Sequence, residues 1–158
     1  MSAIETLILS SSSPVQTEAI AAAVARHCRA GCAVALIGDL GAGKTTFARG
    51  FISALCAPSE PIVSPTFTLA QPYAMPGGGA VWHFDFYRLK SAAEARETGL
   101  EEALQSGISL IEWPELVMEA LPEETLNIEI THAADDDARS LRLSGRGEIW
   151  HSCFNTLK

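Results

Sequence analysis

The 158-residue chain contains few basic residues for its number of acidic ones. Its 11 Lys and Arg residues are outnumbered by 19 Asp and Glu residues, so its formal net charge is −8. Proteins bind nucleic acid largely through cations that neutralise phosphates. This charge balance argues against a large nucleic-acid-binding surface, and any role in nucleic-acid metabolism is expected to run through a protein partner.

Two kinds of membrane-related segment are also missing. No run of 18 or more apolar residues occurs, so the sequence predicts no helix that spans a bilayer. The segment from Met1 to Ser13 lacks a basic stretch and includes Glu5, so it does not resemble a signal peptide. We therefore expect a cytoplasmic protein with no membrane partner.

Closely spaced cysteine pairs are missing as well. The four cysteines, Cys28, Cys32, Cys56 and Cys153, form no C-x-x-C pair. We interpret them as reduced thiols that act as small apolar side chains. Zinc ligation by Cys28, Cys32 and His27 is the less favoured alternative, given the usual ligand spacings.

The chain has the composition of a folded domain, with 47% hydrophobic and 19% charged residues. No internal repeat and no long linker are evident, so residues 1–158 are expected to form one domain. Apolar runs bounded by Gly, Pro and Ser indicate strands, and helical spacing after the capping residues Ser13 and Ser91 indicates helices. Strands are expected at 4–9, 33–37, 67–73, 80–87, 108–111, 125–131 and 140–143, and helices at 14–29, 46–56, 91–105 with a break at Gly99, 114–122 and 147–154.

The segment Gly38 to Thr45 matches G-x-x-x-x-G-K-[ST] at every fixed position, between an apolar strand and a helix. We call it the glycine-rich loop. Its glycines let backbone N–H groups turn inward around phosphates, and the following helix N-terminus adds partial positive charge. Lys44 is expected to reach the β- and γ-phosphates, and Thr45 to ligate Mg²⁺. The loop thus predicts binding of ATP with Mg²⁺, through Gly38, Gly41, Ala42, Gly43, Lys44, Thr45 and Thr46.

Two carboxylates follow apolar strands, as a nucleotide site of this kind requires. Asp85 ends the apolar segment 81–85 within the strand expected at 80–87, and Glu112 directly follows the strand expected at 108–111. The sequence leaves open which of them lies beside Thr45, and the pair suggests that one holds the metal while the other places a water. His83 is interpreted as a strand residue rather than a catalytic base, because no partner for it can be named.

Two further residues are interpreted from their positions in the sequence. Thr66, in Ser64-Pro65-Thr66, is either a sensor of the terminal phosphate or a simple turn former. Trp113 follows Glu112 and could be a core residue, which is the usual position of a lone Trp.

Four motifs together resemble the TsaE (formerly YjeE) family, the bacterial ATPases of tRNA threonylcarbamoyladenosine (t6A) biosynthesis. These motifs are the glycine-rich loop with Thr46, Ser64-Pro-Thr66, His83-Phe-Asp-Phe-Tyr-Arg88 and Glu112-Trp-Pro114. The resemblance implies an α/β fold, namely a single P-loop NTPase domain with a mixed, mainly parallel sheet flanked by helices. It also implies slow ATP hydrolysis by the isolated protein. The implied partners are the TsaD and TsaB subunits, which make t6A37 on tRNA, so that tRNA is met only through that complex.

The resemblance also implies roles for single residues. Lys44 and Thr45 keep their loop roles, Glu112 matches the family's Mg²⁺-binding glutamate, and Asp85 matches an aspartate implicated in catalysis. Catalysis would thus involve Asp85, Glu112 and Lys44, and the metal would be held by Thr45 and Glu112. Thr17 matches a threonine near the base and ribose, Thr66 one in a switch-like segment, and Trp113 a tryptophan near the site. Beyond Asp135 the resemblance assigns no role to Arg139 or Arg142.

Three other functions remain as alternatives. A small-molecule kinase would need an arginine-bearing lid, and the stretch from Ser91 to Gln105 carries only Arg96. A GTPase would need an Asn-Lys-x-Asp motif, which is absent from the sequence. A scaffold that uses ATP only to fold its interface is the third.

Overall fold

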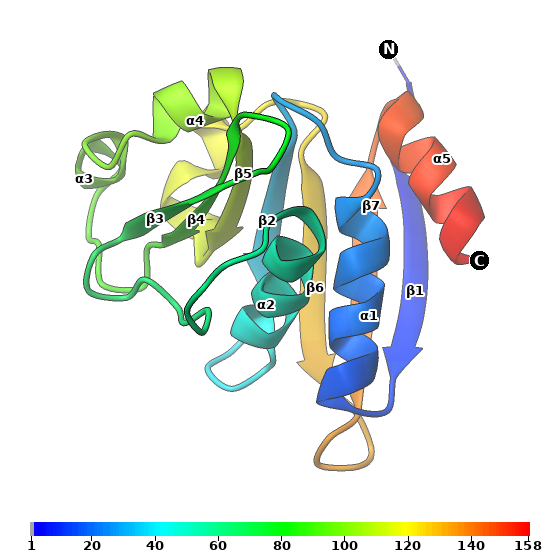
Figure 1. The fold of residues 1–158 in the computed structure, drawn as a ribbon. Coiled ribbons are helices and arrows are strands. Elements are labelled where there is room, and N and C mark those ends of the chain that lie inside the picture. The colour runs from blue at the N-terminus through cyan, green and yellow to red at the C-terminus, as the bar shows by residue number, and fades with distance from the viewer. Residues whose placement is uncertain (1) are drawn as a thin grey trace.

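A seven-stranded mixed β-sheet forms the centre of the computed structural model, which describes residues 2–158 (Figure 1). Its strands are β1 (Glu5–Ser11), β2 (Ala33–Ile37), β3 (Ala70–Ala74), β4 (Ala80–Asp85), β5 (Ile108–Glu112), β6 (Leu126–His132) and β7 (Arg139–Gly145). The strand order is β1-β7-β6-β2-β5-β4-β3. The four central strands, β4, β5, β2 and β6, are parallel to one another. β3 pairs with β4, β7 with β6 and β1 with β7, each antiparallel, so β1 runs in the same direction as the central strands.

Two of the central strands, β2 and β5, are apolar and almost fully buried, as expected of parallel strands covered on both faces. Every residue of β5 is buried, and so are the first four residues of β2. In the parallel ladders Leu36 lies opposite Glu112, and Asp85 also lies opposite Glu112. The carboxyl ends of β2, β4 and β5 therefore meet at one edge of the sheet, where ligand sites of open α/β sheets form.

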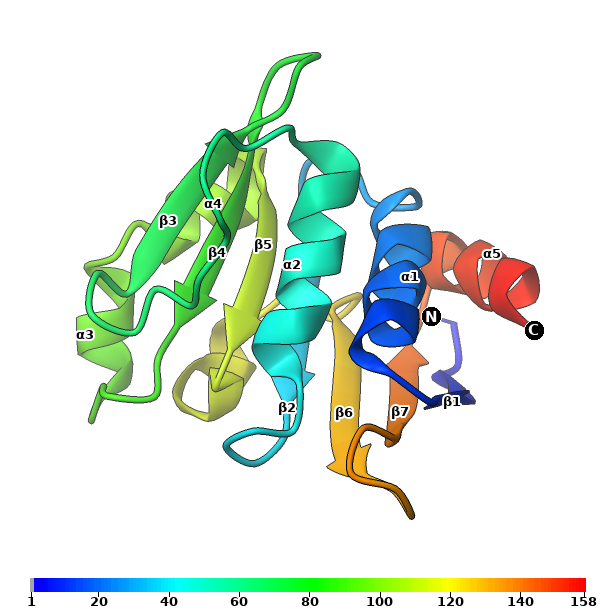
Figure 2. The same cartoon turned by 60° about the horizontal axis from the view of Figure 1, so that its bottom comes forward.

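Helices cover both faces of the sheet (Figure 2). On one face lie α1 (Pro14–Ala25) and α2 (Lys44–Leu55) side by side, with α5 (Glu148–Leu157) next to α1. On the other face, α3 (Ala92–Arg96), α4 (Leu100–Ser106) and the 3₁₀ helix η1 (Pro114–Ala120) pack behind β4 and β5. The expected α/β architecture with a mixed sheet and flanking helices is thus confirmed.

A glycine sets the distance between α1 and α2. A Cβ atom added at Gly50 of α2 would collide with the backbone of Glu18 in α1. The two helices therefore approach each other more closely than any residue with a side chain at position 50 would allow. This contact fixes α2, and with it the loop that precedes α2, against the rest of the molecule.

The core consists of two clusters of apolar side chains. The larger one fills the space between the sheet and α1, α2 and α5, and includes Phe47, Phe51 and Trp150. The smaller one lies on the opposite face and is built on Phe84 and Leu100. Both clusters flank β5, so the strand that ends in Glu112 is held from two sides.

Several element boundaries differ from the expected ones. The helix expected at 14–29 ends at Ala25, because the chain continues in tighter turns in which Cys28 N–H donates to Ala25 O. The strand expected at 67–73 begins at Ala70, since Leu69 has a φ of +69° and closes a turn with Pro65.

Two more boundaries depend on local hydrogen bonding and geometry. The strand expected at 80–87 ends at Asp85, whose carboxylate accepts the Tyr87 N–H at 2.9 Å and turns the chain. The helix expected at 114–122 is a 3₁₀ helix. Within residues 2–158, no helix is both long and apolar enough to cross a membrane.

Candidate functional site

The glycine-rich loop connects β2 to α2, and its glycines are required by its shape. Gly41 and Gly43 have φ values of +77° and +112°, which residues with a Cβ rarely adopt. A Cβ on Gly38 would lie 2.6 Å from the carbonyl oxygen of Ile130 in β6. The loop therefore sits directly over the carboxyl end of β6, and side chains at these positions would displace it.

Lys44 begins α2 and carries a cation that points back into the loop. Its Nζ donates to the carbonyl oxygens of Gly38 at 2.5 Å and Asp39 at 2.8 Å, and the residue is only 4% exposed. Nζ also lies 4.1 Å from the centre of the Trp113 ring. Burial lowers the pKa of Lys44, while the nearby carboxylates of Glu112 and Asp85 act in the opposite direction.

Glu112 lies beside Thr45, so the geometry assigns this position to Glu112 rather than Asp85. The Thr45 hydroxyl is 3.0 and 3.2 Å from the two carboxylate oxygens of Glu112 and donates to them. On its other side, Glu112 Oε2 is 2.7 Å from His83 Nε2. Since a carboxylate accepts hydrogen bonds, the Nε2–H tautomer of His83 suits this contact. His83 and Glu112 are 0% and 2% exposed, so this contact is shielded from water.

Asp85 forms a second cluster of hydrogen bonds with the segment that crosses from α2 to β3. Its Oδ2 accepts from the hydroxyl of Ser64 and, at 3.3 Å, from that of Thr66. Its Oδ1 accepts from Tyr87 N–H. Since these partners are uncharged, Asp85 can respond to a ligand without first breaking an ion pair.

Trp113 follows Glu112 in an unusual backbone conformation, with a φ of +57°. Its half-buried ring lies between the Lys44 ammonium and the Tyr87 ring, whose centre is 4.7 Å away. Trp113 belongs to neither core cluster, so its interpretation as a core residue is wrong. The positive φ instead turns the side chain toward the loop.

These groups line one cavity of about 270 Å³. The lining residues are Leu40, Gly41, Gly43, Lys44, Thr45, Thr46, Ser64, Thr66, Asp85, Glu112 and Trp113. Its polar contributions include one ammonium, two carboxylates and several hydroxyls. A cavity with this mixture suits a multiply charged anion that binds together with a metal cation.

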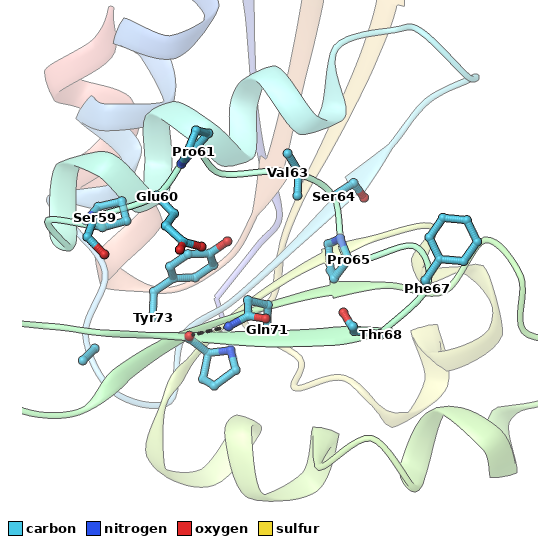
Figure 3. A pocket seen from close by; sticks show the side chains of 13 residues that line it. Ser59, Glu60, Pro61, Val63, Ser64, Pro65, Phe67, Thr68, Gln71 and Tyr73 are labelled. Carbon is cyan, nitrogen blue, oxygen red and sulfur yellow. Dashed lines mark hydrogen bonds between the residues drawn. The ribbon is translucent and has the colours of Figure 1, made fainter.

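A larger cavity, of about 510 Å³, lies between β3 and the proline-rich segment 58–68 (Figure 3). Pro61, Val63, Pro65 and Phe67 contribute to its lining, together with Tyr73. Glu60 is the only ionisable side chain in it besides the Tyr73 phenol, so it offers no cation for phosphates. We therefore place the candidate site in the smaller cavity. Ser64 lines both, so the proline-rich segment separates them.

Three of the expected nucleotide-binding residues lie outside the main cavity. Thr17 is buried, with its hydroxyl 2.6 Å from that of Ser11, and it lines a separate cavity of about 30 Å³. Ala42 is buried in the larger core cluster, and Gly38 lies behind the loop against β6. Thr46 lines both the main cavity and the small one beside Thr17, so the two are neighbours.

The structure adds three residues that the sequence did not single out for the site. His83 contacts Glu112, Ser64 contacts Asp85, and Arg139 donates to the carbonyl oxygens of Gly41 and Ala42. A sequence signal existed for His83, because residues two apart in a strand share a face and Asp85 ends that strand. Arg139 has no such signal, since it lies 97 residues from Ala42.

Comparisons with known proteins place these residues in a family. A family model described as "Threonylcarbamoyl adenosine biosynthesis protein TsaE" matches residues 11–141. A "tRNA threonylcarbamoyladenosine biosynthesis protein TsaE" from Rickettsia bellii is 42% identical over 124 residues, which cover 78% of this chain and 85% of the relative. The protein of the same name from Bacillus subtilis is 41% identical over 125 residues, covering 78% and 77%.

A solved structure matches the chain over almost its full length. The crystal structure of YdiB from Bacillus subtilis matches with a TM-score of 0.77 and 31% sequence identity, covering 99% of this chain and 97% of that chain. The family model spans most of the chain, and the relatives share about two residues in five with it. The chain therefore belongs to the TsaE family of t6A biosynthesis proteins.

Proposed function

We propose that this protein is a Mg²⁺-dependent ATPase with a P-loop NTPase fold, which supports t6A37 modification of tRNA together with the TsaD–TsaB complex. One observation carries the proposal: the glycine-rich loop brings Lys44 and Thr45 to the carboxyl edge of the sheet, where Thr45 lies within hydrogen-bond distance of Glu112. Family membership supplies the pathway, and this geometry supports the chemistry.

Binding of the triphosphate rests on the loop and on Lys44. Backbone N–H groups of the loop and the N-terminus of α2 provide partial positive charge, and the buried ammonium adds a full charge. Lys44 Nζ donates to the carbonyls of Gly38 and Asp39 at the loop itself. The cation is therefore already at the loop when phosphates arrive, and little reorganisation is needed.

Thr45 and Glu112 are the groups that would hold Mg²⁺. Mg²⁺ prefers oxygen ligands and binds through one or two protein groups plus phosphate oxygens and waters. The hydroxyl–carboxylate pair at 3.0 Å fits this requirement, and the contact from His83 fixes the orientation of the carboxylate. Bound there, Mg²⁺ would neutralise charge on the phosphates during transfer.

Asp85 is the group that would orient the attacking water. Its carboxylate lies in the same cavity as Lys44 and is held by hydroxyls of Ser64 and Thr66. A carboxylate oxygen there would accept a hydrogen bond from water and take up its proton as the water oxygen bonds to the γ-phosphorus, while the bond from that phosphorus to the leaving ADP oxygen breaks. Ser64 and Thr66 thereby couple the crossing segment to the state of the site.

The partner role rests on the family and on the chain's charge. An acidic protein with few cations is a poor RNA binder by itself, which fits contact with tRNA only through TsaD and TsaB. The protein is not the transferase in this proposal. Its cycle of ATP binding and hydrolysis supports turnover of the complex.

The test is an assay of ADP and free phosphate with and without the TsaD–TsaB complex. We expect equal amounts of ADP and phosphate, slow release by the isolated protein and faster release with the complex. ADP formed without free phosphate would indicate a kinase instead. Equal rates with and without the complex would contradict the partner role, and preference for GTP over ATP would contradict the nucleotide assignment.

A further inference from the structure

Arg139, the first residue of β7, contacts the glycine-rich loop, yet the proposed function gives it no role. Its Nε donates to Ala42 O at 2.7 Å, and its Nη2 donates to Gly41 O at 3.3 Å. The remaining nitrogen, Nη1, donates to the carbonyl oxygens of Asp136 at 2.6 Å and Ala138 at 2.8 Å. The guanidinium thus joins the loop to the β6–β7 turn entirely through backbone carbonyls.

The geometry of the peptide bond gives these contacts a consequence. In a trans peptide the C=O and the N–H point in opposite directions. When Arg139 holds Ala42 O on its own side of the loop, the Gly43 N–H of the same peptide unit is directed to the opposite side. Since Gly43 also lines the candidate phosphate cavity, this places the amide where a phosphate oxygen would be bound.

The loop needs an external support of this kind. Gly41 and Gly43 both have positive φ and no side chain, so the backbone between them can rotate at low cost. Arg139 itself is held by two strands, because its register partners are Ser11 in β1 and His132 in β6. A group fixed in the sheet therefore restrains a segment that is intrinsically flexible.

We infer that Arg139 is a positioning residue, which holds the Ala42–Gly43 peptide in the orientation that binds phosphate. This inference rests on the proposed function. The competing role is direct contact with the nucleoside, because Arg139 also lines the cavity of about 30 Å³ beside Thr17. The two roles differ in the ligand part that is recognised: a support for the loop affects any polyphosphate, whereas a nucleoside contact affects only ligands that carry a base.

The first experiment measures the loop without any ligand, by amide hydrogen exchange. We expect Arg139→Met to speed exchange in peptides that cover the glycine-rich loop, while the interior of α2 stays protected. Arg142→Met is the matched control, because Arg142 is exposed three residues further along β7 and, within residues 2–158, forms an ion pair only with Glu129, at 3.4 Å. Unchanged exchange in the loop of Arg139→Met would overturn the inference, whether or not the protein binds ATP.

The second experiment measures the affinity for MgATP and for inorganic tripolyphosphate with Mg²⁺ by calorimetry. In Arg139→Met, the loss of the charge-assisted contacts should lower the affinity for both ligands by a similar factor, about tenfold. Arg139→Lys should lose most of that affinity as well, since one ammonium cannot reach both loop carbonyls and the turn. Weaker binding of MgATP but not of tripolyphosphate would overturn the inference in favour of a nucleoside contact. Full affinity in Arg139→Lys would also overturn it, because the positive charge alone would then explain the effect of Arg139.

The two proposals can fail separately. A wild-type protein that binds neither ligand would contradict the proposed function, while the exchange experiment would still test the contact. A wild-type protein that binds MgATP, together with an Arg139→Met variant that binds it equally well, would contradict only the role of Arg139. Equal denaturation midpoints for both Met variants and the wild type confirm that folding is intact.

Discussion

Asp85 and Glu112 lie opposite each other at the ends of neighbouring strands, yet their partners differ in kind. Glu112 contacts the loop threonine and a buried histidine, whereas Asp85 contacts hydroxyls of the crossing segment. Two carboxylates in different environments can take different roles, one at the metal and one at the water. The sequence alone identified both residues but could not divide these roles, because strand register decides which one meets Thr45.

Asp85 is the first residue to test. We expect Asp85→Ala to lower the rate of ATP hydrolysis by about 100-fold or more, the usual contribution of a positioned general base. The dissociation constant for MgATP should change far less, since Lys44 and the loop remain. Calorimetry and phosphate release measure the two quantities. Asp135→Ala, in the exposed β6–β7 turn, is the control, and an unchanged hydrolysis rate in Asp85→Ala would show that the assigned role is wrong.

His83 is predicted to act through Glu112. In His83→Phe the Glu112 carboxylate loses its buried donor at 2.7 Å, and its orientation toward Thr45 becomes less defined. We expect the affinity for ATP with Mg²⁺ to fall, while the affinity measured with EDTA stays unchanged. The free energy of unfolding should fall by about 1–3 kcal/mol, because a buried acceptor loses a partner. An equal loss of affinity with and without Mg²⁺ would contradict this role.

Lys44 gives a prediction with a pH dependence. Burial lowers its pKa below that of an ordinary lysine, so the folded protein releases this proton at a lower pH than the unfolded chain. In that window the unfolded state binds more protons, so the free energy of unfolding of the ligand-free protein should rise with pH.

ATP affinity should change in the opposite direction over the same window, because phosphate binding needs the protonated ammonium. Other groups also titrate at alkaline pH, so the stability of the wild type is compared with that of Lys44→Met, which removes only this lysine. The stability difference between the two proteins should rise with increasing pH, and the MgATP affinity of the wild type should fall. A wild-type affinity that is independent of pH up to the range of a free lysine would contradict the lowered pKa.

At the scale of elements, the sequence predicted the strand, glycine-rich loop and helix around residues 33–56, because each has a strong local signal. Strands that correspond to β3 and β4 and the break at Gly99 were also predicted, since glycines bound these elements; Gly99 has a φ of +92°. The ends of α1, β3 and β4 were not, because they depend on bonds such as the one from Tyr87 N–H to Asp85. The local sequence pattern determines which elements form, whereas contacts within the folded structure determine where they end.

The contact between α1 and α2 is tested by Gly50→Ala. The added methyl group would collide with the backbone of Glu18, so the helices must separate or the backbone must shift. We expect the free energy of unfolding to fall by about 1–3 kcal/mol, which is typical of overpacking. Urea denaturation measures this change. Gly77→Ala is the control, because its Cβ would meet nothing within 4 Å, and equal stability of the two variants would contradict the packing argument.

At the scale of the whole molecule, the site exists because the sheet order brings distant segments together. β2 lies between β5 and β6, so the loop that follows β2 meets Glu112 on one side and the β6–β7 region with Arg139 on the other. Strand order is set by interactions between segments far apart in the chain, which no local pattern encodes. The sequence therefore indicated most of the candidate site residues through motifs, but not the residues that support them.

The account depends on the glycine-rich loop holding a triphosphate with Lys44. Calorimetric titration of ATP in the presence of Mg²⁺ tests this most directly, on the wild type, on Lys44→Ala and on Lys158→Ala, which removes an exposed lysine at the end of α5. We predict binding by the wild type and by Lys158→Ala, and none by Lys44→Ala. A well-folded wild-type protein that releases no heat with ATP and Mg²⁺, or a Lys44→Ala variant that binds as tightly as the wild type, would contradict it.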